Sequence, residues 1–265
     1  SQASKEIRNV TTSDSQIIDI RGVHKQYPVE GGALKVLEGL NLAVRPGEFL
    51  SIVGASGCGK STLLRLLTGL DTDYEGEIRV RGEVVRGTSL DRGIVFQEHR
   101  LFPWLTVRQN VGLGLLNSAW SEDQRSMAVR EHIELVGLEG FEEVYPHQLS
   151  GGMAQRAAIA RGLVNQPSIL LLDEPFGALD ALTRSKLQGE LQRIWQAEGI
   201  TMILVTHDVE EAVYLGDRVV IMQPRPGRIR RVIDIDVAHP RDRADPALKG
   251  YYDEVRAEIV EVAQH

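Results

Sequence analysis

Alternating apolar and polar positions predict a chain in which short strands and helices follow one another. Strand-like runs, each bounded by polar or turn residues, cover 17–23, 40–54, 77–80, 93–96, 168–173, 201–207 and 218–222. Within 40–54, the pair Pro46-Gly47 is typical of a turn between two strands. The runs after residue 167 are short and apolar, a pattern that favours strands buried on both faces of a parallel sheet.

Apolar residues at helical spacing predict helices between these strands. Such spacing covers 61–70, 182–197 and 210–215, and a terminal helix is expected at 247–262. Strand signals disappear between about 98 and 162, which predicts an α-helical subdomain inserted in an α/β domain. Residues 1–16 are polar and are predicted to form a flexible tail. The rest, 17–265, is expected to form a single domain that ends in a short C-terminal extension, 224–265.

Composition places the chain among ordinary globular proteins. It has 265 residues, is 42% hydrophobic and 25% charged, and carries 30 basic against 37 acidic residues, a net charge of -7. This balance disfavours broad electrostatic binding to nucleic acid. The single cysteine, Cys58, allows no intrachain disulfide and favours a cytosolic setting. Because no apolar run is long enough to span a bilayer, a role at a membrane would require an anchoring partner.

A glycine-rich phosphate loop is predicted where a strand-like run meets a leucine-rich helix. The sequence FLSIVGASGCGKST matches the G-x-x-x-x-G-K-[ST] pattern in the strand–loop–helix context that it requires. Lys60 is expected to neutralise phosphate charge, and the Ser61 hydroxyl is expected to bind Mg²⁺. The alternative is a glycine-rich turn that binds nothing. The predicted nucleotide contacts of this loop are Gly54, Ala55, Ser56, Gly57, Cys58, Gly59, Lys60, Ser61 and Thr62.

Two carboxylates follow a buried strand in SILLLDEP. Ligands of an open α/β sheet bind outside the carboxyl ends of its strands, where Asp173 and Glu174 are expected. Asp173 is suited to hold Mg²⁺ or its waters, and Glu174 to polarise a water against a γ-phosphate. Two solvated turn acids are the alternative. The phosphate loop and this pair together predict a Mg²⁺-dependent nucleotide triphosphatase or kinase.

A second anion site is predicted in LSGGMAQR. Ser150, Gly151 and Gly152 open onto helix-forming residues, an arrangement that directs backbone N–H groups at an anion. The chain already has one complete phosphate loop, so the stretch raises the question of which phosphate it binds.

The order GASGCGKST, LSGGMAQR, DEP and THD resembles the ATP-binding subunit of ABC transporters, from about Ile17 to Met222. The resemblance implies a P-loop NTPase of the ABC ATPase type, with a mixed sheet core, an antiparallel β subdomain and an α-helical subdomain. It also implies ATP and Mg²⁺, and two subunits that sandwich two ATP molecules. In that arrangement Ser150, Gly151 and Gly152 contact the γ-phosphate bound by the other subunit.

The resemblance assigns roles to further residues of this chain. Tyr27 would stack on adenine, although alone it reads as an edge-strand tyrosine. Gln97 would touch Mg²⁺ and the attacking water, His207 would contact the γ-phosphate, and Asp180 lies in a loop that crosses between subunits. A loop glutamine and a structural histidine are the alternatives for Gln97 and His207. The implied catalytic residues are Glu174, His207 and Gln97, and the implied metal ligands are Ser61, Gln97 and Asp173.

Two classes of protein use this set of motifs. One is the transporter motor, and the other is the soluble ABC ATPase of DNA repair, chromosome structure or translation. Soluble forms usually carry long coiled coils or a second cassette, and neither is seen here. In transporters the region of RLFPWLTVRQNVGLGL receives a helix of the membrane subunit, which favours the motor. Core packing is the alternative for Leu101, Phe102, Trp104 and Leu105.

Finer details resemble importers of nitrate, sulfonates, taurine or bicarbonate, including PRPGRI at 224–229 and PRDRADP at 240–246. The implied partners are a membrane permease, an extracytoplasmic solute-binding protein that acts through the permease, and a second ATPase subunit, identical or paralogous, but no nucleic acid. The implied location is peripheral, on the cytoplasmic face of the inner membrane. A long C-terminal regulatory domain is not expected after Met222, although a small helix docking on its own domain is possible.

Overall fold

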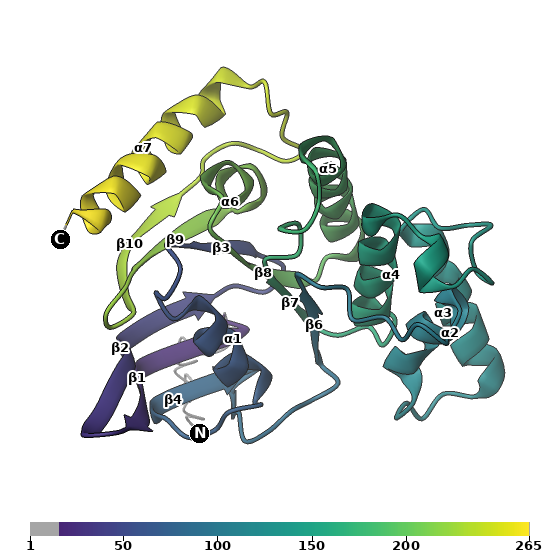
Figure 1. Cartoon of the computed structure of the whole chain (residues 1–265), viewed down its shortest axis with the longest axis horizontal. Helices are drawn as coiled ribbons and strands as arrows, with labels where there is room; N and C mark the ends of the chain where they lie inside the picture. The colour runs from purple at the N-terminus through teal and green to yellow at the C-terminus, as the bar shows by residue number, and fades with distance from the viewer. Residues whose placement is uncertain (1–15, 265) are drawn as a thin grey trace, which may run out of the picture.

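A computed structural model of the chain describes residues 16–264. The predicted flexible tail therefore lies outside the described residues, except for Gln16. Two sheets and the helices that pack against them make up the described part (Figure 1).

The larger sheet has six strands in the order β10-β9-β3-β8-β7-β6, and β10 alone runs antiparallel to its neighbour. Every residue of β8 is buried, as are all but the last residue of β7 and all but the two end residues of β9, which confirms the prediction of strands covered on both faces. The bounds are β3 Phe49–Val53, β6 Arg92–Phe96, β7 Ile169–Asp173, β8 Thr201–Thr206, β9 Arg218–Gln223 and β10 Arg228–Asp234.

The smaller sheet is antiparallel, with the order β2-β1-β4-β5, as the resemblance implied. Helix α1, Lys60–Thr68, packs with it and with the larger sheet, because the leucines of α1 share one buried cluster with residues of both sheets. The strand bounds are β1 Ile18–Val29, β2 Gly32–Val44, β4 Glu75–Val80 and β5 Glu83–Val84.

The chain between β6 and β7 forms only helices. Figure 1 shows them at one end of the molecule, beside β6. Capping explains where two of them begin. Thr106 and Ser121 each form a reciprocal capping box with a glutamine three residues later. The elements are α2 Val107–Gly112, η1 Leu113–Leu115, α3 Glu122–Leu135, η2 Pro146–Gln148 and α4 Gly151–Leu163. The helical content is confirmed, whereas the division into subdomains stays a prediction.

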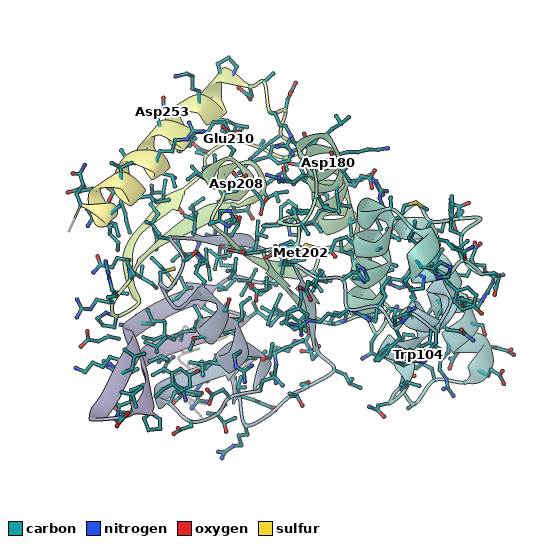
Figure 2. The ribbon with its side chains drawn as sticks, in the orientation of Figure 1. Trp104, Asp180, Met202, Asp208, Glu210 and Asp253 are labelled. Carbon is teal, nitrogen blue, oxygen red and sulfur yellow. The ribbon has the colours of Figure 1, made fainter. Side chains whose placement is uncertain are left out.

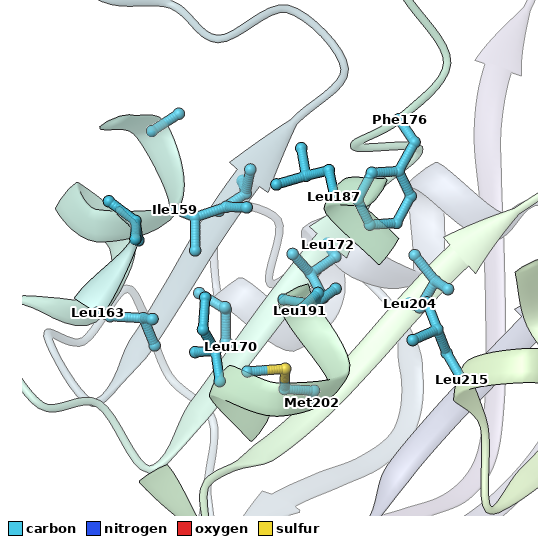
Figure 3. Packing of buried hydrophobic residues seen from close by; sticks show 14 of the residues in the cluster. Ile159, Leu163, Leu170, Leu172, Phe176, Leu187, Leu191, Met202, Leu204 and Leu215 are labelled. Carbon is cyan, nitrogen blue, oxygen red and sulfur yellow. The ribbon is translucent and has the colours of Figure 1, made fainter. Parts of the chain in front are cut away.

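Helices α5 (Ala181–Glu198), α6 (Val209–Leu215) and α7 (Pro246–Ala263) complete the fold. Figure 3 shows leucines of α5 meeting apolar residues of β7 and β8, which form the core beneath the strand ends. The predicted terminal helix is confirmed as α7. Strand β10 was not predicted, because an edge strand that pairs on one side only has little alternation of buried and exposed residues.

The helices of 16–264 give no candidate membrane span, since none is both long enough and apolar enough to cross a bilayer.

Candidate functional site

The phosphate loop joins the buried strand β3 to α1, as the sequence predicts. Its last residue, Gly59, has a φ of +88° and serves as the N-cap of α1 without a side-chain hydrogen bond. A Cβ at Gly59 would lie 2.4 Å from a methyl group of Leu37, so only glycine fits there. The first N–H groups of α1 therefore point out of the loop, and this is the geometry of an anion site.

A cavity of about 330 Å³ opens above this helix end. Lys60 lines this cavity, and its Nζ donates to the carbonyl of Ala55 at 3.3 Å and to that of Gly54. Burial raises the pKa of the Cys58 thiol, so its side chain stays protonated and is no nucleophile. The lining residues are Val36, Ser56, Gly57, Cys58, Gly59, Lys60, Ser61, Thr62 and Glu174.

A hydroxyl and a carboxylate meet beside the cavity. Ser61 Oγ lies 3.5 Å from Asp173 Oδ1, at the end of β7. Burial, followed by the negative charge of Glu174, raises the pKa of Asp173. A cation at this position would relieve the repulsion, and oxygen ligands suit Mg²⁺. In residues 16–264 no group of three or more His, Cys, Asp or Glu side chains could hold a metal.

Glu174 and His207 are brought together from the ends of adjacent strands β7 and β8. His207 Nδ1 lies 3.1 Å from Glu174 Oε1. The Glu174 N–H donates to the carbonyl of Val205 at 2.9 Å, and its φ is +47°, in the left-handed region. A residue other than glycine is uncommon there, and such backbone geometry is concentrated at functional sites.

Gln97 follows β6 directly, and β6 pairs with β7 in a register that sets Phe96 opposite Asp173. A Cβ added to Gly177 would lie 3.0 Å from the Gln97 amide, so this side chain packs on the loop after Glu174. The structure therefore brings Gln97 to the same edge of the sheet as the two carboxylates.

Tyr27 is placed differently. Its hydroxyl lies 3.5 Å from an Asp71 carboxyl oxygen, and its ring lies 4.6 Å from the Lys25 ammonium. Val36, on the neighbouring strand β2, lines the phosphate cavity, and Tyr27 does not. Its contact with adenine stays a prediction. Sequence reasoning missed Val36, because an aliphatic strand residue gives no sign that it faces a ligand.

The signature residues form a second surface. Ser150 caps α4, and its hydroxyl accepts from the Met153 N–H at 3.2 Å. Asp180 caps α5 and accepts from the Thr183 N–H at 3.0 Å. A Cβ at Gly152 would lie 2.6 Å from the methyl group of Thr183, so the two helix starts are in contact.

This second surface is separate from the phosphate cavity. In the described part of the chain, Ser150, Gly151, Gly152 and Asp180 do not line the cavity. Figure 1 shows α4 among the helices at one end of the molecule, away from α1. Apart from Tyr27, the predicted site residues thus fall into two groups, one at or beside the phosphate cavity and one at the starts of α4 and α5.

A buried parallel strand, a glycine-rich loop, a lysine at the helix start and carboxylates at neighbouring strand ends define a P-loop nucleoside triphosphatase. A profile of the family described as ABC transporter matches residues 37–177. The chain belongs to the ABC transporter family and is an ABC ATPase.

Relatives and solved structures agree with this family. The chain is similar to the aliphatic sulfonates import ATP-binding protein SsuB of Bacillus thuringiensis subsp. konkukian, with 46% identity over 94% of this chain and 96% of the relative. It is 44% identical to the bicarbonate transport ATP-binding protein CmpC of Synechococcus elongatus, over 93% of this chain but 38% of that relative. Its fold is similar to a dimeric post-hydrolysis state of the ATP-binding cassette MJ0796 bound to ADP and Pi, with a TM-score of 0.72, 34% identity, and coverage of 83% of this chain and 100% of that one.

Proposed function

We propose that the chain is the ATP-hydrolysing subunit of an importer of a small anion, of the sulfonate, taurine, nitrate or bicarbonate type. Two of its relatives are named for the import of aliphatic sulfonates and the transport of bicarbonate, which supports an anionic solute. The solute would be bound by a membrane permease and an extracytoplasmic binding protein. The chain would work beneath the permease, on the cytoplasmic face of the membrane.

The two separate groups of site residues support a dimer. Lys60, Ser61 and Glu174 line the phosphate cavity, whereas the exposed residues Ser150 and Gly151 lie at the start of α4, outside that cavity. A head-to-tail pair would bring the second group of one chain to the nucleotide of the other, so that each of two ATP sites is completed by its partner. A dimeric solved neighbour bound to ADP and Pi is consistent with this arrangement. ATP would then favour closure, and its hydrolysis would allow reopening.

Each residue has a defined task in this proposal. Lys60 and the N–H groups at the start of α1 would hold the phosphates. Ser61, Asp173 and Gln97 would hold Mg²⁺, which stabilises the charge that develops during phosphoryl transfer. Glu174 would orient the attacking water or accept its proton. His207, 3.1 Å from that carboxylate, would hold it in place and reach the γ-phosphate.

The observation that carries the transport assignment is an exposed aromatic pair on the helical part. Phe102 is 42% exposed and Trp104 is 69% exposed, and their ring centroids are 5.1 Å apart. Figure 2 shows Trp104 among the helices of 107–163, away from Asp180 at the start of α5. The same helical part has a hollow of about 340 Å³ between α2 and α3, lined by Arg108, Gly112, Leu115, Glu122, Arg125, Ser126 and Val129. An exposed pair of large aromatic side chains in contact with each other is typical of a docking surface for a protein partner.

Affinity purification of the tagged chain from detergent-solubilised membranes of its native cells tests the proposal. The wild-type chain should retain a multi-span permease, identified by mass spectrometry. Trp104→Glu should keep its ATPase activity and lower permease recovery roughly tenfold or more, as expected for a central aromatic contact. Val260→Glu, which alters an exposed apolar residue on α7, should keep the permease. Recovery of soluble partners alone would favour the soluble ABC ATPase class instead.

A further inference from the structure

The backbone that carries Gln97 is held by two side chains of α4. The amide of Gln155, a side chain 2% exposed, donates to the carbonyl of Phe96 at 2.7 Å. Arg161 donates to the carbonyls of His99 and Arg100, at 2.8 and 2.9 Å. One helix therefore binds the chain immediately before Gln97 and again after it.

Contacts within the loop make this short segment compact. Arg100 has a φ of +52°, and its guanidinium lies 3.6 Å from the centroid of the Phe96 ring. The loop thus folds back on itself. The residues whose carbonyls bind to α4 lie at its two ends, with Phe96 at one end and His99 and Arg100 at the other. Displacing α4 relative to the sheet would pull on both anchor points and would move Gln97.

The same helix begins at the signature surface. Ser150 caps its first turn, and Gln155 follows five residues later, about 8 Å along the helix axis. An α-helix transmits displacement along its axis because every turn is tied to the next by hydrogen bonds. The contact surface for a second chain and the support of Gln97 are therefore two parts of one rigid element.

We propose that Gln155 and Arg161 are positioning residues that make the placement of Gln97 depend on the position of α4. When Ser150–Gly152 are drawn onto the ATP of the partner, α4 carries the Gln97 loop with it. When the signature residues of one chain close on the ATP of the partner, Gln97 of that same chain is therefore brought to the metal and the attacking water at the chain's own ATP. This inference rests on the ATP-bound dimer of the proposed function and assigns the residues that couple its two sites.

Steady-state ATPase kinetics of Gln155→Met test this inference. Methionine keeps the length of the side chain but removes the N–H donor. We expect kcat to fall roughly tenfold, the effect of losing one buried hydrogen bond, with the ATP affinity of the monomer within about twofold of wild type because the phosphate loop is untouched. In a Gln97→Ala background the same substitution should lower kcat no further, since Gln155 acts through Gln97.

Two further variants separate positioning from general loss of packing. Gln192→Met removes another buried glutamine, whose side-chain oxygen accepts from the backbone N–H of Arg241 at 2.9 Å and whose hydrogen-bond partners do not include the Gln97 loop. Its kcat should stay within about twofold of wild type. Arg161→Lys can donate to the same loop with one nitrogen instead of two, so its kcat should fall less than that of Gln155→Met. If Gln155→Met does not fold, the same comparison can be made by combining Arg161→Lys with Gln97→Ala and measuring whether the two effects on kcat multiply.

The outcomes distinguish the inference from the function on which it rests. If wild type hydrolyses ATP and dimerises with it, but the effects of Gln155→Met and Gln97→Ala multiply, the positioning role is refuted and the proposed dimer stands. An equal loss of kcat in Gln192→Met would refute it as well. A wild-type chain that never dimerises with ATP would overturn both.

Discussion

The buried acid Glu211 should make the stability of the protein depend on pH. Glu211 lies on α6 and is 4% exposed, and its Oε2 accepts from the Gln188 amide at 2.7 Å. Burial raises its pKa from the ordinary 4.5 to about 7. The native state therefore keeps this proton at pH values where the unfolded chain has released it.

The sign and the size follow from proton linkage. Between pH 4.5 and about 7 the native state binds more protons than the unfolded state, so the free energy of unfolding falls as the pH rises. The contribution of Glu211 is fully present below pH 4.5 and is lost above about pH 7. The difference between these pKa values corresponds to about 3 kcal/mol.

Urea unfolding of wild type and Glu211→Gln at about pH 5 and about pH 8 measures this effect. Glutamine keeps an oxygen that accepts from Gln188 but carries no charge. The variant should gain up to about 3 kcal/mol relative to wild type between the two pH values. Glu210→Gln, on the exposed side of the same helix, serves as the control and should show no such gain. A stability difference between Glu211→Gln and wild type that is independent of pH would refute the reasoning.

Two further predictions concern turnover and folding. Glu174→Gln should bind ATP but lose turnover on the order of a hundredfold or more and accumulate as an ATP-bound dimer in light scattering; adding Ser150→Arg should return it to the monomer, and a dimer that persists would contradict the shared site. Arg241→Met removes a buried guanidinium that donates to the carbonyls of Val213 and Gly216, at 2.8 and 2.7 Å. The unpaired carbonyls should lower the free energy of unfolding by about 3 kcal/mol or more in chemical denaturation. Arg256→Met, at an exposed ion pair, should have a much smaller effect, and equal losses would count against this account of Arg241.

The side-chain contacts of the motif PRDRADP, residues 240–246, could not be predicted from its sequence. The sequence suggested only that it belongs with a group of importers. In the structure Arg241 binds the carbonyls at the end of α6, Arg243 donates to the carbonyl of Ser185, and Asp245 caps α7. These contacts fasten the C-terminal extension to the core. No periodicity in the segment itself could have indicated them, because the partners of the two arginines on α5 and at the end of α6 are distant in the chain.

Some parts of the candidate site could likewise be predicted from the sequence, whereas others depend on the tertiary structure. The phosphate loop and the DEP carboxylates were predicted because their chemistry depends on residues close together in sequence, after strands whose apolar runs are easily recognised. Gln97 as a neighbour of the carboxylates follows instead from the pairing of β6 with β7. Its support by Gln155 and Arg161 was not predicted, since a glutamine and an arginine in a helix are ordinary surface residues by composition.

By itself the sequence determined the local elements of this protein: the buried strands, the glycine loop that only a backbone free to adopt positive φ can form, and the capped starts of α4 and α5. These depend on neighbours within a few residues, so their information lies in short stretches of chain. Only the tertiary structure decided that β10 closes the edge of the sheet and that Glu174 meets His207. It also decided that Ser150 lies outside the phosphate cavity of its own chain. Strand order and helix packing place these residues, and both are set by the burial of apolar surface between segments far apart in sequence.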